Sequence, residues 1–435
     1  MTSHALSQVG IPKSELFSVY ADGKQIPVFE GHDHHFAHIA VTDTVALEVK
    51  VSEPINTVNI RPSRHGKPYR VENGSVFFTV CRGEYLSFEI NGDIDRPLIL
   101  FADAPMSYGV YDGYTVHRFR AGTYTKVGKM MLESNTVVII EEGAAVEGCL
   151  WAKDVHNVRI LGGGVLHHDR SLEQGKMPIF FECSEDVEIG GITILGYHTW
   201  NLLVREVKHC VIENIKILAH EVWSDGIDIV GCEDVLVRHI FIKNEDDCVC
   251  IKSSLSKKGN FRGFDVRRVL VEDCVLWNGP RGNSLEIGYE TNNSTVENIM
   301  FRHVDVLHRE TQASKFNRAI ISIHNSGNAA IKNITYEDIY AESTDENFVV
   351  IAHMHQPDWG IGAGSIEDIT IRDLTLAGGE LRPSKISAIA ERSHEKRVTN
   401  NIVFENLTVL GEPIKDAQTA EKFGFTLEAD NVKFL

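Results

Sequence analysis

The sequence predicts an all-β protein in which a right-handed parallel β-helix is preceded by a small N-terminal β-sandwich. One observation is a short phrase, with alternating Ile and Val around an Asn, Asp or His, that recurs from about residue 134 onward. A second is the spacing of its copies, roughly 25 to 35 residues, which is typical of solenoids. A third is that residues 1–105 lack this phrase and show separate alternating runs.

The recurring phrase has the character of strands. Its residues alternate with a period of two, β-branched side chains dominate, and Gly, Asn and Asp stand at the breaks. Stacked coils of such strands bury one face and pair each strand with its equivalents above and below. A propeller or stacked sandwiches would also give short strands, but the copies lack the Asn-Gly and Asp-Gly hairpin turns of antiparallel blades. The copies are CVIENIKI from Cys210, VLVRHIFI from Val235, VLVEDCVL from Val269, IMFRHVDV from Ile299, IKNITYEDI from Ile331, IEDITIRDLTL from Ile366 and NIVFENLTV from Asn401.

The chain has 435 residues, a length that suits one small domain and one elongated domain. The runs TVALEVKV, SVFFTV, YLSFEI and PLILFA, separated by Pro, Gly and Asp, predict an antiparallel sandwich over residues 1–105. We expect the β-helix, with the functional site, to span residues 106–435.

The composition narrows the partners. A net charge of -18 argues against nucleic acid and against an anionic membrane, because phosphate binding depends largely on Lys and Arg. It argues only weakly against an acidic sugar, since a local basic pocket can exist on an acidic surface. The sequence gives no oligomeric state.

The compartment is predicted from the N-terminus and the cysteines. MTSHALSQVG lacks the basic and apolar segments of a secretory leader, and no apolar run reaches the length of a membrane span. We therefore expect a cytoplasmic protein, or a secreted one if a leader has been removed. The eight cysteines form no CxxC pair, and we expect buried free thiols. Those in apolar runs are Cys183, Cys210, Cys248, Cys250 and Cys274.

Two neighbouring segments, WSDGIDIVG and NEDDCVCIKSS, carry the candidate chemistry. If Ile227 stacks on Val249, a register of 22 residues places Asp225 over Asp247, with adjacent coils about 4.8 Å apart. Asp246 lies beside this pair. Two carboxylates one coil apart repel each other unless they share a proton, a cation or a water molecule.

The parity of these aspartates sets a condition on the geometry. Asp225 and Asp247 have the parity of the inward-facing Ile227 and Val249, so they reach the surface only if each strand begins just after them. Gly226 makes such a break plausible.

Three adjoining carboxyl groups suit hydrolysis of a glycosidic bond with inversion. That reaction needs one carboxylic acid for the leaving oxygen and one carboxylate for water, roughly 6.5 to 9.5 Å apart. Asp225 and Asp247 would hold the water and Asp246 would be the acid, kept protonated by its like-charged neighbour. Spacing alone also allows a Ca²⁺ site or a solvated turn.

These residues resemble the clan of the polygalacturonases, glycoside hydrolase family 28, and the dextranases and isopullulanases, family 49. SDGIDI matches the Asn-Thr-Asp-Gly motif at Asp225, and EDDCVCIKS matches the Asp-Asp motif at Asp246 and Asp247. GPRGNSLEIGYE follows the Gly-His-Gly motif, but Asn283 stands where that clan has histidine. The resemblance covers about residues 125–410 and implies an inverting hydrolase with Asp246 as general acid and no metal or organic cofactor.

A second departure concerns the sugar. The Arg-Ile-Lys motif, which engages a uronate carboxylate in pectin enzymes, is missing; RAIISIHNSG places Ser322 or His324 at the outward positions. Loss of that pair favours a neutral sugar. Family 49 also has a sandwich before its helix and neutral α-glucan substrates, so a neutral α-glucan is the predicted substrate. Pectic galacturonides are the alternative.

Aromatic and polar side chains near these turns are candidates for sugar contacts. Asp228, Cys250 and Glu286 share an outward row, and Lys252 and Arg281 supply positive charge. Tryptophans in turns serve equally often as packing, which applies to Trp200 and Trp359. The predicted substrate-binding residues are Asn283, Glu286, Asp228, Lys252, Arg281, Tyr289, Trp223 and His324.

Three other interpretations are less favoured. A lyase or epimerase would need a basic proton abstractor and commonly Ca²⁺, for which only Lys252 and Arg281 offer positive charge. A non-catalytic carbohydrate-binding β-helix would not need three packed carboxylates. The histidines of GHDHHFAHIA alternate along an apparent strand and would not converge on one zinc ion.

Overall fold

The computed structural model describes residues 3–168, 177–197, 199–254, 262–310, 318–345, 347–360, 362–380 and 382–435. Strands dominate these residues, and the predicted fold class is confirmed. Two compact units are present. Unit 1 comprises Met1–Val127, Val137–Glu147 and Ile160–His167, and unit 2 comprises Gly128–Thr136, Gly148–Arg159 and His168–Leu435. The predicted boundary at residue 105 stays a prediction.

Unit 1 contains two five-stranded sheets, with strand orders β2-β1-β5-β8-β7 and β3-β4-β10-β9-β6. Their inner faces share one apolar core, since β5 alternates so that Val45, Leu47 and Val49 face inward. One pairing departs from the predicted antiparallel pattern, because β10 runs parallel to β4. The elements are α1 (Ser3–Gln8), β1 (Phe17–Ala21), β2 (Lys24–Ile26), β3 (Phe29–Glu30), β4 (His35–Ala40), β5 (Thr44–Val51), β6 (Val58–Arg61), the 3-10 turn Ser63–His65, β7 (Tyr69–Glu72), β8 (Ser75–Cys81), β9 (Tyr85–Ile90) and β10 (Leu98–Asp103).

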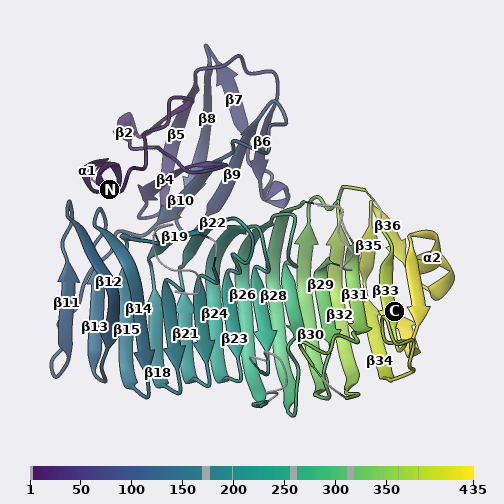
Figure 1. Ribbon diagram of the computed structural model, residues 1–435. Helices are drawn as coiled ribbons and strands as arrows, with labels where there is room; N and C mark the ends of the chain where they lie inside the picture. The colour runs from purple at the N-terminus through teal and green to yellow at the C-terminus, as the bar shows by residue number, and fades with distance from the viewer. Residues whose placement is uncertain are drawn as a thin grey trace. The chain divides into compact units, whose positions relative to one another are not determined.

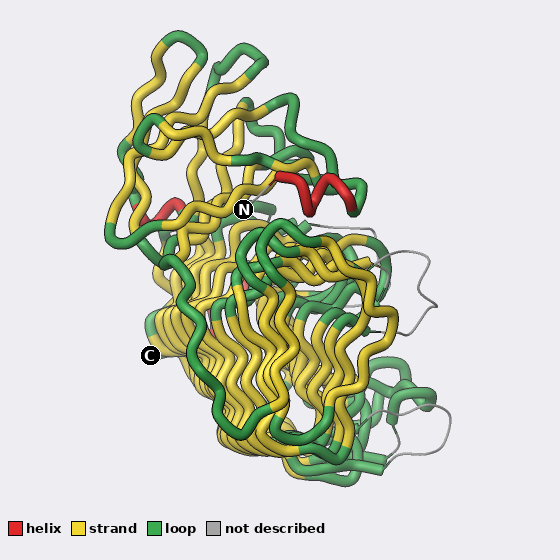
Figure 2. The backbone as a smooth tube through the Cα atoms, turned by 90° about the vertical axis from the view of Figure 1, so that its left-hand side faces the viewer, coloured by secondary structure: helices red, strands yellow, loops and turns green. Residues whose placement is uncertain are grey.

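The β-helix strands form a sheet in which strands pair with equivalent strands of the adjacent coil, except that β36 (Glu412–Ile414) pairs antiparallel with β35 (Leu407–Val409) in a hairpin. Figure 2 shows the coils lying over one another, with strands in yellow. The strands up to the first site coil are β11 (Thr115–Phe119), β12 (Tyr124–Leu132), β13 (Thr136–Ile140), β14 (Ala145–Lys153), β15 (His156–Gly162), β16 (Val165–His167), β17 (Ile179–Glu182), β18 (Glu185–Gly190), β19 (Thr193–Tyr197), β20 (Leu202–Arg205), β21 (Lys208–Glu213) and β22 (Lys216–His220).

The later coils continue the same stacking to the C-terminus (Figure 1). Their elements are β23 (Ile227–Val230), β24 (Glu233–Asn244), β25 (Val249–Lys252), β26 (Val266–Asn278), β27 (Leu285–Tyr289), β28 (Thr295–Arg309), β29 (Ala319–Asn325), β30 (Ala330–Ala341), β31 (Asn347–His353), β32 (Ser365–Leu376), β33 (Ser384–Ser387), β34 (Val398–Glu405), β35 (Leu407–Val409), β36 (Glu412–Ile414), α2 (Ala417–Lys422), β37 (Phe425–Glu428) and β38 (Asp430–Phe434).

The interior of unit 2 is a set of apolar columns. Neighbouring short strands β23, β25, β27, β29 and β31 pair in parallel, so equivalent side chains lie one above another. Every member of the central column is fully buried. The column consists of Ile229, Ile251, Ile287, Ile323 and Ile351.

The Asn, Asp or His of the recurring phrase has a conformational role. Equivalent copies have φ near +50°, including 51° at His239, 54° at Asp273 and 50° at Asp338. Asn, Asp and His tolerate this left-handed conformation better than branched residues do. The repeated polar residue therefore bends each long strand at the same place in successive coils.

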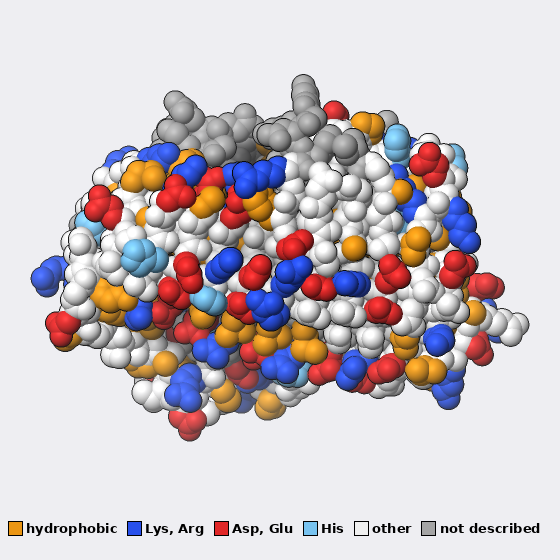
Figure 3. All heavy atoms as spheres, turned by 90° about the horizontal axis from the view of Figure 1, so that it is seen from below, with side chains coloured by type: hydrophobic (Ala, Val, Ile, Leu, Met, Phe, Trp, Pro, Cys, Tyr) orange, Lys and Arg blue, Asp and Glu red, His pale blue; other side chains and the backbone are white. Residues whose placement is uncertain are grey.

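Charged side chains of both signs are interspersed on the face seen in Figure 3. Ion pairs join adjacent coils: Arg268 Nε lies 2.6 Å from Asp234 Oδ1, and Arg302 Nη2 lies 2.6 Å from Glu272 Oε2. Such exposed pairs contribute little each. The acidic side chains on this face therefore lie among Arg and Lys side chains and do not form a single negative patch.

The cysteines are all free thiols, and six of the eight are buried. One prediction was wrong, because Cys183 is exposed. It follows the end of β17 with φ of 50°, so it occupies a turn rather than a strand. Among the described residues, no helix is long and apolar enough to cross a membrane. The cytoplasmic location stays a prediction.

Candidate active site

Three carboxyl groups from two adjacent coils meet beside β23 and β25. The predicted register is confirmed, since Ile227 pairs with Val249. The Gly226 amide donates to the Asp247 carbonyl oxygen at 2.8 Å, which stacks the two turns. One carboxylate oxygen from each of Asp225, Asp246 and Asp247 lies within 4.8 Å of the others. We call these three residues the aspartate cluster.

The parity condition is met. β23 begins at Ile227 and β25 at Val249, so Asp225 and Asp247 each lie in the turn before a strand. A side chain at Gly226 would put a Cβ 2.4 Å from the Cys248 carbonyl oxygen. This close approach requires glycine and allows the chain to turn directly after Asp225.

Asp247 is held by the next coil through Asn283. The Asn283 backbone amide and side-chain Nδ2 donate to Asp247 Oδ1 at 2.7 and 2.9 Å. Asn283 Oδ1 in turn accepts from the Ala319 amide at 2.9 Å, so its side chain is oriented from both ends. Both Asp247 and Asn283 are buried. Asn283 therefore contacts a carboxylate of the aspartate cluster.

Asp246 is the member of the aspartate cluster that is only partly buried. Its two oxygens accept from the backbone amides of Trp223 and Asp247, each at 3.1 Å. Burial and the charge of Asp247 raise the pKa of Asp246 to about 6, against the lowering effects of Arg318 and Lys252. A carboxyl group with this pKa and partial exposure can hold a proton and deliver it to a ligand.

Trp223 has two features of a functional position. Its side chain is 53% exposed, and its φ is 64°, which is unusual for a bulky residue. Its amide donates to Asp246, so this left-handed turn holds the Trp223 backbone against the candidate acid.

Asp225 and Asp228 share a buried cation. Lys252 Nζ lies 2.6 Å from Asp228 Oδ1 and 3.3 Å from Asp225 Oδ2. Burial raises the pKa of Asp228 to about 7 and that of Asp225 well above its ordinary value. Lys252 opposes both shifts. Lys252, which was predicted to contact the sugar, is thus paired with Asp225 and Asp228 of the chain itself.

The predicted outward row is present, since Asp228, Cys250 and Glu286 are partners along adjacent strands. Each is nevertheless fully buried. Glu286 accepts from the Ser322 hydroxyl and lies 3.0 Å from His324 Nδ1. The row is therefore a buried polar network.

His324 joins this network to an aromatic pair. Its ring stacks on that of Tyr289, with centroids 4.4 Å apart, and Tyr289 lies 4.9 Å from Trp359. Burial alone would lower the pKa of His324, but Glu286 outweighs it and leaves that pKa raised. The imidazole charge is compensated by Glu286 within the chain.

Arginines lie at the edge of the site. Arg281 Nε lies 3.6 Å from Glu245 Oε2, a long ion pair. Arg318, which was not among the predicted site residues, donates from Nη1 to the Pro280 carbonyl at 2.8 Å and lowers the pKa of Asp246 by its charge. Arg318 could have been predicted from the sequence, because it is the first residue of the segment RAIISIHNSG, which was already identified as part of the site.

Asparagines behind the aspartate cluster were also missed. The Nδ2 groups of Asn201, Asn244 and Asn278 donate to the carbonyl oxygens of Asp225, Asp247 and Asp246 at 2.9, 2.8 and 2.6 Å. Two of them end the long strands β24 and β26. This repeated position could have revealed them in the sequence, because buried asparagine side chains commonly donate hydrogen bonds to the backbone carbonyl oxygens of turns.

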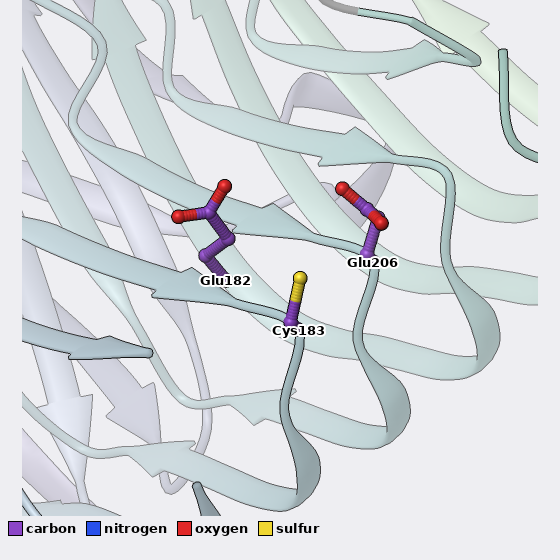
Figure 4. A group of neighbouring side chains, drawn as sticks. All are labelled: Glu182, Cys183 and Glu206. Atoms are coloured by element: carbon purple, nitrogen blue, oxygen red, sulfur yellow. The ribbon is translucent and has the colours of Figure 1, made fainter. Parts of the chain in front are cut away.

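A cation does not fit the aspartate cluster well. Ca²⁺ takes six to eight oxygen ligands, whereas the ammonium of Lys252 lies 3.3 Å from Asp225. A second group, Glu182, Cys183 and Glu206, also lies close enough for one ion (Figure 4). There Glu182 is paired with Arg205 and with Lys153, at 3.1 Å from the latter. Neither group favours a metal over the cations already present.

A right-handed parallel β-helix that carries three adjoining aspartates in its wall is typical of the β-helical glycoside hydrolases. The sequence profile of Glycosyl hydrolases family 28 matches residues 149–420. Because this match covers more than half of the chain, the chain belongs to glycoside hydrolase family 28.

Individual relatives are distant. A probable polygalacturonase of Vitis vinifera is 23% identical over 265 residues, which are 59% of this chain and 42% of that protein. A probable exopolygalacturonase B of Neosartorya fischeri is 26% identical over 226 residues, 46% of either chain. This chain thus spans less than half the length of these relatives.

Solved structures support the fold. Dex49A from Penicillium minioluteum has a TM-score of 0.59 at 11% identity, covering 97% of this chain and 95% of its own. The polygalacturonase from Erwinia carotovora ssp. carotovora has a TM-score of 0.53 at 15% identity, covering 73% and 89%. Both confirm the β-helix, and the first extends the likeness to nearly the whole chain.

Proposed function

We propose that this chain hydrolyses a glycosidic bond with inversion, using the aspartate cluster. The observation that carries the proposal is the unequal environment of three carboxyl groups within 4.8 Å. Asp246 is partly exposed with a pKa of about 6, while Asp225 and Asp247 are buried. Asp246 is the general acid for the leaving oxygen, and the buried pair activates the water.

The water lies between Asp225 and Asp247 in this mechanism. Asn283 donates twice to Asp247 Oδ1, which leaves Oδ2 for the water. The nearest carboxylate oxygens of the cluster lie within 4.8 Å of one another, below the roughly 6.5 to 9.5 Å between the carboxyl groups of inverting pairs and close to the roughly 5 to 5.5 Å of retaining ones. Inversion therefore rests on the family, and the product anomer tests it directly.

The proposed substrate is a carbohydrate with a neutral sugar at the cleaved bond, most simply an α-glucan. A uronate would want a cation with free hydrogen-bonding capacity. Lys252 is bonded to Asp228 and Asp225, His324 to Glu286, and Arg281 lies against Glu245. The fold likeness to Dex49A is compatible with this choice.

Hydrolysis of pectic galacturonides is the second candidate. The curated relatives bear the names polygalacturonase and exopolygalacturonase. Arg318 lowers the pKa of Asp246 by its charge, more than Lys252 does. A galacturonide specificity would depend on Arg318.

The experiment measures reducing ends released from dextran and pullulan oligosaccharides and from oligogalacturonides. Wild type is compared with Asp246→Asn and with Asp273→Asn, an exposed aspartate whose left-handed φ suits asparagine. We expect glucan cleavage that falls at least about 100-fold in Asp246→Asn and is unchanged in the control. NMR of fresh product should show the inverted anomer.

The outcomes separate the alternatives. Cleavage of galacturonides alone would move the substrate to the pectic class, and a retained anomer would make a cluster carboxylate the nucleophile. Full activity in Asp246→Asn would remove it as the acid. Binding of glycans without cleavage would favour a carbohydrate-binding protein.

A further inference from the structure

Lys252 is a buried ammonium group at the centre of a carboxylate-rich wall. The residue is 3% exposed, and its strand β25 stacks directly on β23, which follows Asp225. Its Nζ contacts Asp228 Oδ1 at 2.6 Å and Asp225 Oδ2 at 3.3 Å, and lies 3.7 Å from the ring centroid of Trp200. Carboxylates on two sides and an aromatic face on a third fix the position of its charge.

The charge of Lys252 is permanent over the pH range of enzyme assays. Burial alone would lower its pKa, but the surrounding acids outweigh this and leave it well above the ordinary value. A lone buried charge would be costly, so the lysine and its carboxylates stabilise each other. The titratable groups that face Lys252 or its partners are Asp225, Asp228, Asp246, Asp247, Cys250 and Glu290.

Acids outnumber cations in this wall, so the aspartate cluster retains a proton. Where carboxyl groups lie this close together, the proton goes to the group that is least stabilised as an anion. Asp225 touches the ammonium directly at 3.3 Å but faces the like charge of Asp228, whereas Asp246 receives two backbone amides at 3.1 Å and the charge of Arg318. A full charge in contact favours ionisation more than neutral amides do.

We propose that Lys252 is a positioning residue that favours the ionised form of Asp225, the form that can accept a proton from the water, against the burial that disfavours it. The assignment rests on the proposed function, since acid and base roles have meaning only for that reaction. It replaces the expected sugar contact of Lys252. Asp228 anchors the same ammonium from the strand face and keeps it beneath Asp225.

The test compares Lys252→Met with Lys216→Met. Methionine keeps most of the volume and removes the charge. Lys216 is an equally buried lysine of the same β-helix whose Nζ donates to Asn214 Oδ1 at 2.8 Å. The readouts are kcat, KM and the pH dependence of kcat on the glycan that wild type cleaves.

In Lys252→Met we expect kcat to fall about 100-fold or more, with KM little changed. The acidic limb should move to higher pH by about 1 to 3 units, because Asp225 loses its contacting cation. Lys216→Met should keep the wild-type limb. A higher KM with unchanged kcat would restore the sugar contact and overturn the proposal, as would an unmoved limb.

Asp228→Asn should shift the acidic limb of the pH profile of kcat in the opposite direction. This variant tests the proposal if Lys252→Met does not fold. The negative charge of Asp228 raises the pKa of Asp225. Without the charge of Asp228, Lys252 pairs with Asp225 only and stabilises its ionised form more strongly. The acidic limb of the pH profile of kcat should therefore move to lower pH. A shift to higher pH would contradict the assigned role.

An activity-independent measurement separates this proposal from the proposed function. The raised pKa values of Asp225 and Asp228 mean that protonation favours the folded state. Their contribution is present at low pH and is lost as pH rises through about 7, the pKa of Asp228.

Without Lys252 both pKa values rise further, so the Tm deficit of Lys252→Met should be larger at pH 8 than at pH 5. Lys216→Met should show equal deficits at the two values. If wild type cleaves no glycan, the proposed function fails and this result still stands. A pH-independent deficit in Lys252→Met would overturn the electrostatic role.

Discussion

Asn283 offers the sharpest test of the aspartate cluster. Its Nδ2 donates to Asp247 Oδ1 at 2.9 Å, and its Oδ1 accepts from the Ala319 amide at 2.9 Å. In Asn283→Ala the backbone amide bond to Asp247 remains, at 2.7 Å, but the side-chain donor is lost. The carboxylate then keeps its position less firmly and presents Oδ2 to the water less often.

The magnitude follows from the two lost bonds. A hydrogen bond to a charged group contributes about 1.5 to 3 kcal/mol, which corresponds to about 10- to 150-fold in kcat if it acts in the transition state. The unpaired Ala319 amide would cost about 1 to 3 kcal/mol of folding stability. We expect both effects in this variant.

Asn325→Ala is the matched control. Asn325 is also fully buried, donates to the Ala329 carbonyl at 2.9 Å and accepts from the Thr291 hydroxyl at 2.8 Å. It touches no member of the aspartate cluster through these bonds. Urea unfolding and kcat are measured for both variants. Equal losses of kcat in the two variants, or none in Asn283→Ala, would refute the orientation of Asp247 by Asn283.

Two further predictions use the partly exposed side of the site. Trp223→Gly should raise KM about 5-fold or more, on the scale of the about 1 to 3 kcal/mol that an aromatic ring contributes by stacking on a base, and glycine keeps the left-handed φ of 64°. Oligosaccharide binding to Asp246→Asn with and without this change tests it by calorimetry, and unchanged affinity would make Trp223 a structural residue. Because Asp246 must be protonated and its pKa is about 6, the alkaline limb of the pH profile of kcat should fall above about pH 6. A rate that still rises from pH 6 to 8 would exclude it as the acid.

The sequence predicted the stacking of the site because that stacking depends on periodicity. Alternation fixes which residues face the core, and the isoleucine columns then fix the register of Ile227 on Val249. Asp225 and Asp247 follow from that register without further information. The left-handed turns were also encoded, since only a few residue types suit a φ near +50°.

Burial of the outward face was not predictable in the same way. Parity tells that Glu286 and His324 point away from the core, but it does not tell what covers them. Both are fully buried, and their charges are compensated by each other. The same limit applies to Lys252, whose partners come from another coil.

The connections between site strands differ in length while the stack does not. Ile227 lies 22 residues before its partner Val249, whereas Val249 lies 36 residues before Leu285, and Leu285 lies 36 before Ile321. Lengthening such a connection costs little, about 0.6 kcal/mol for each doubling. An insertion in one coil can therefore add or remove surroundings of the sugar while the carboxyl groups keep their places. During evolution of this fold, the residues that contact the substrate can therefore change almost independently of the catalytic carboxyl groups.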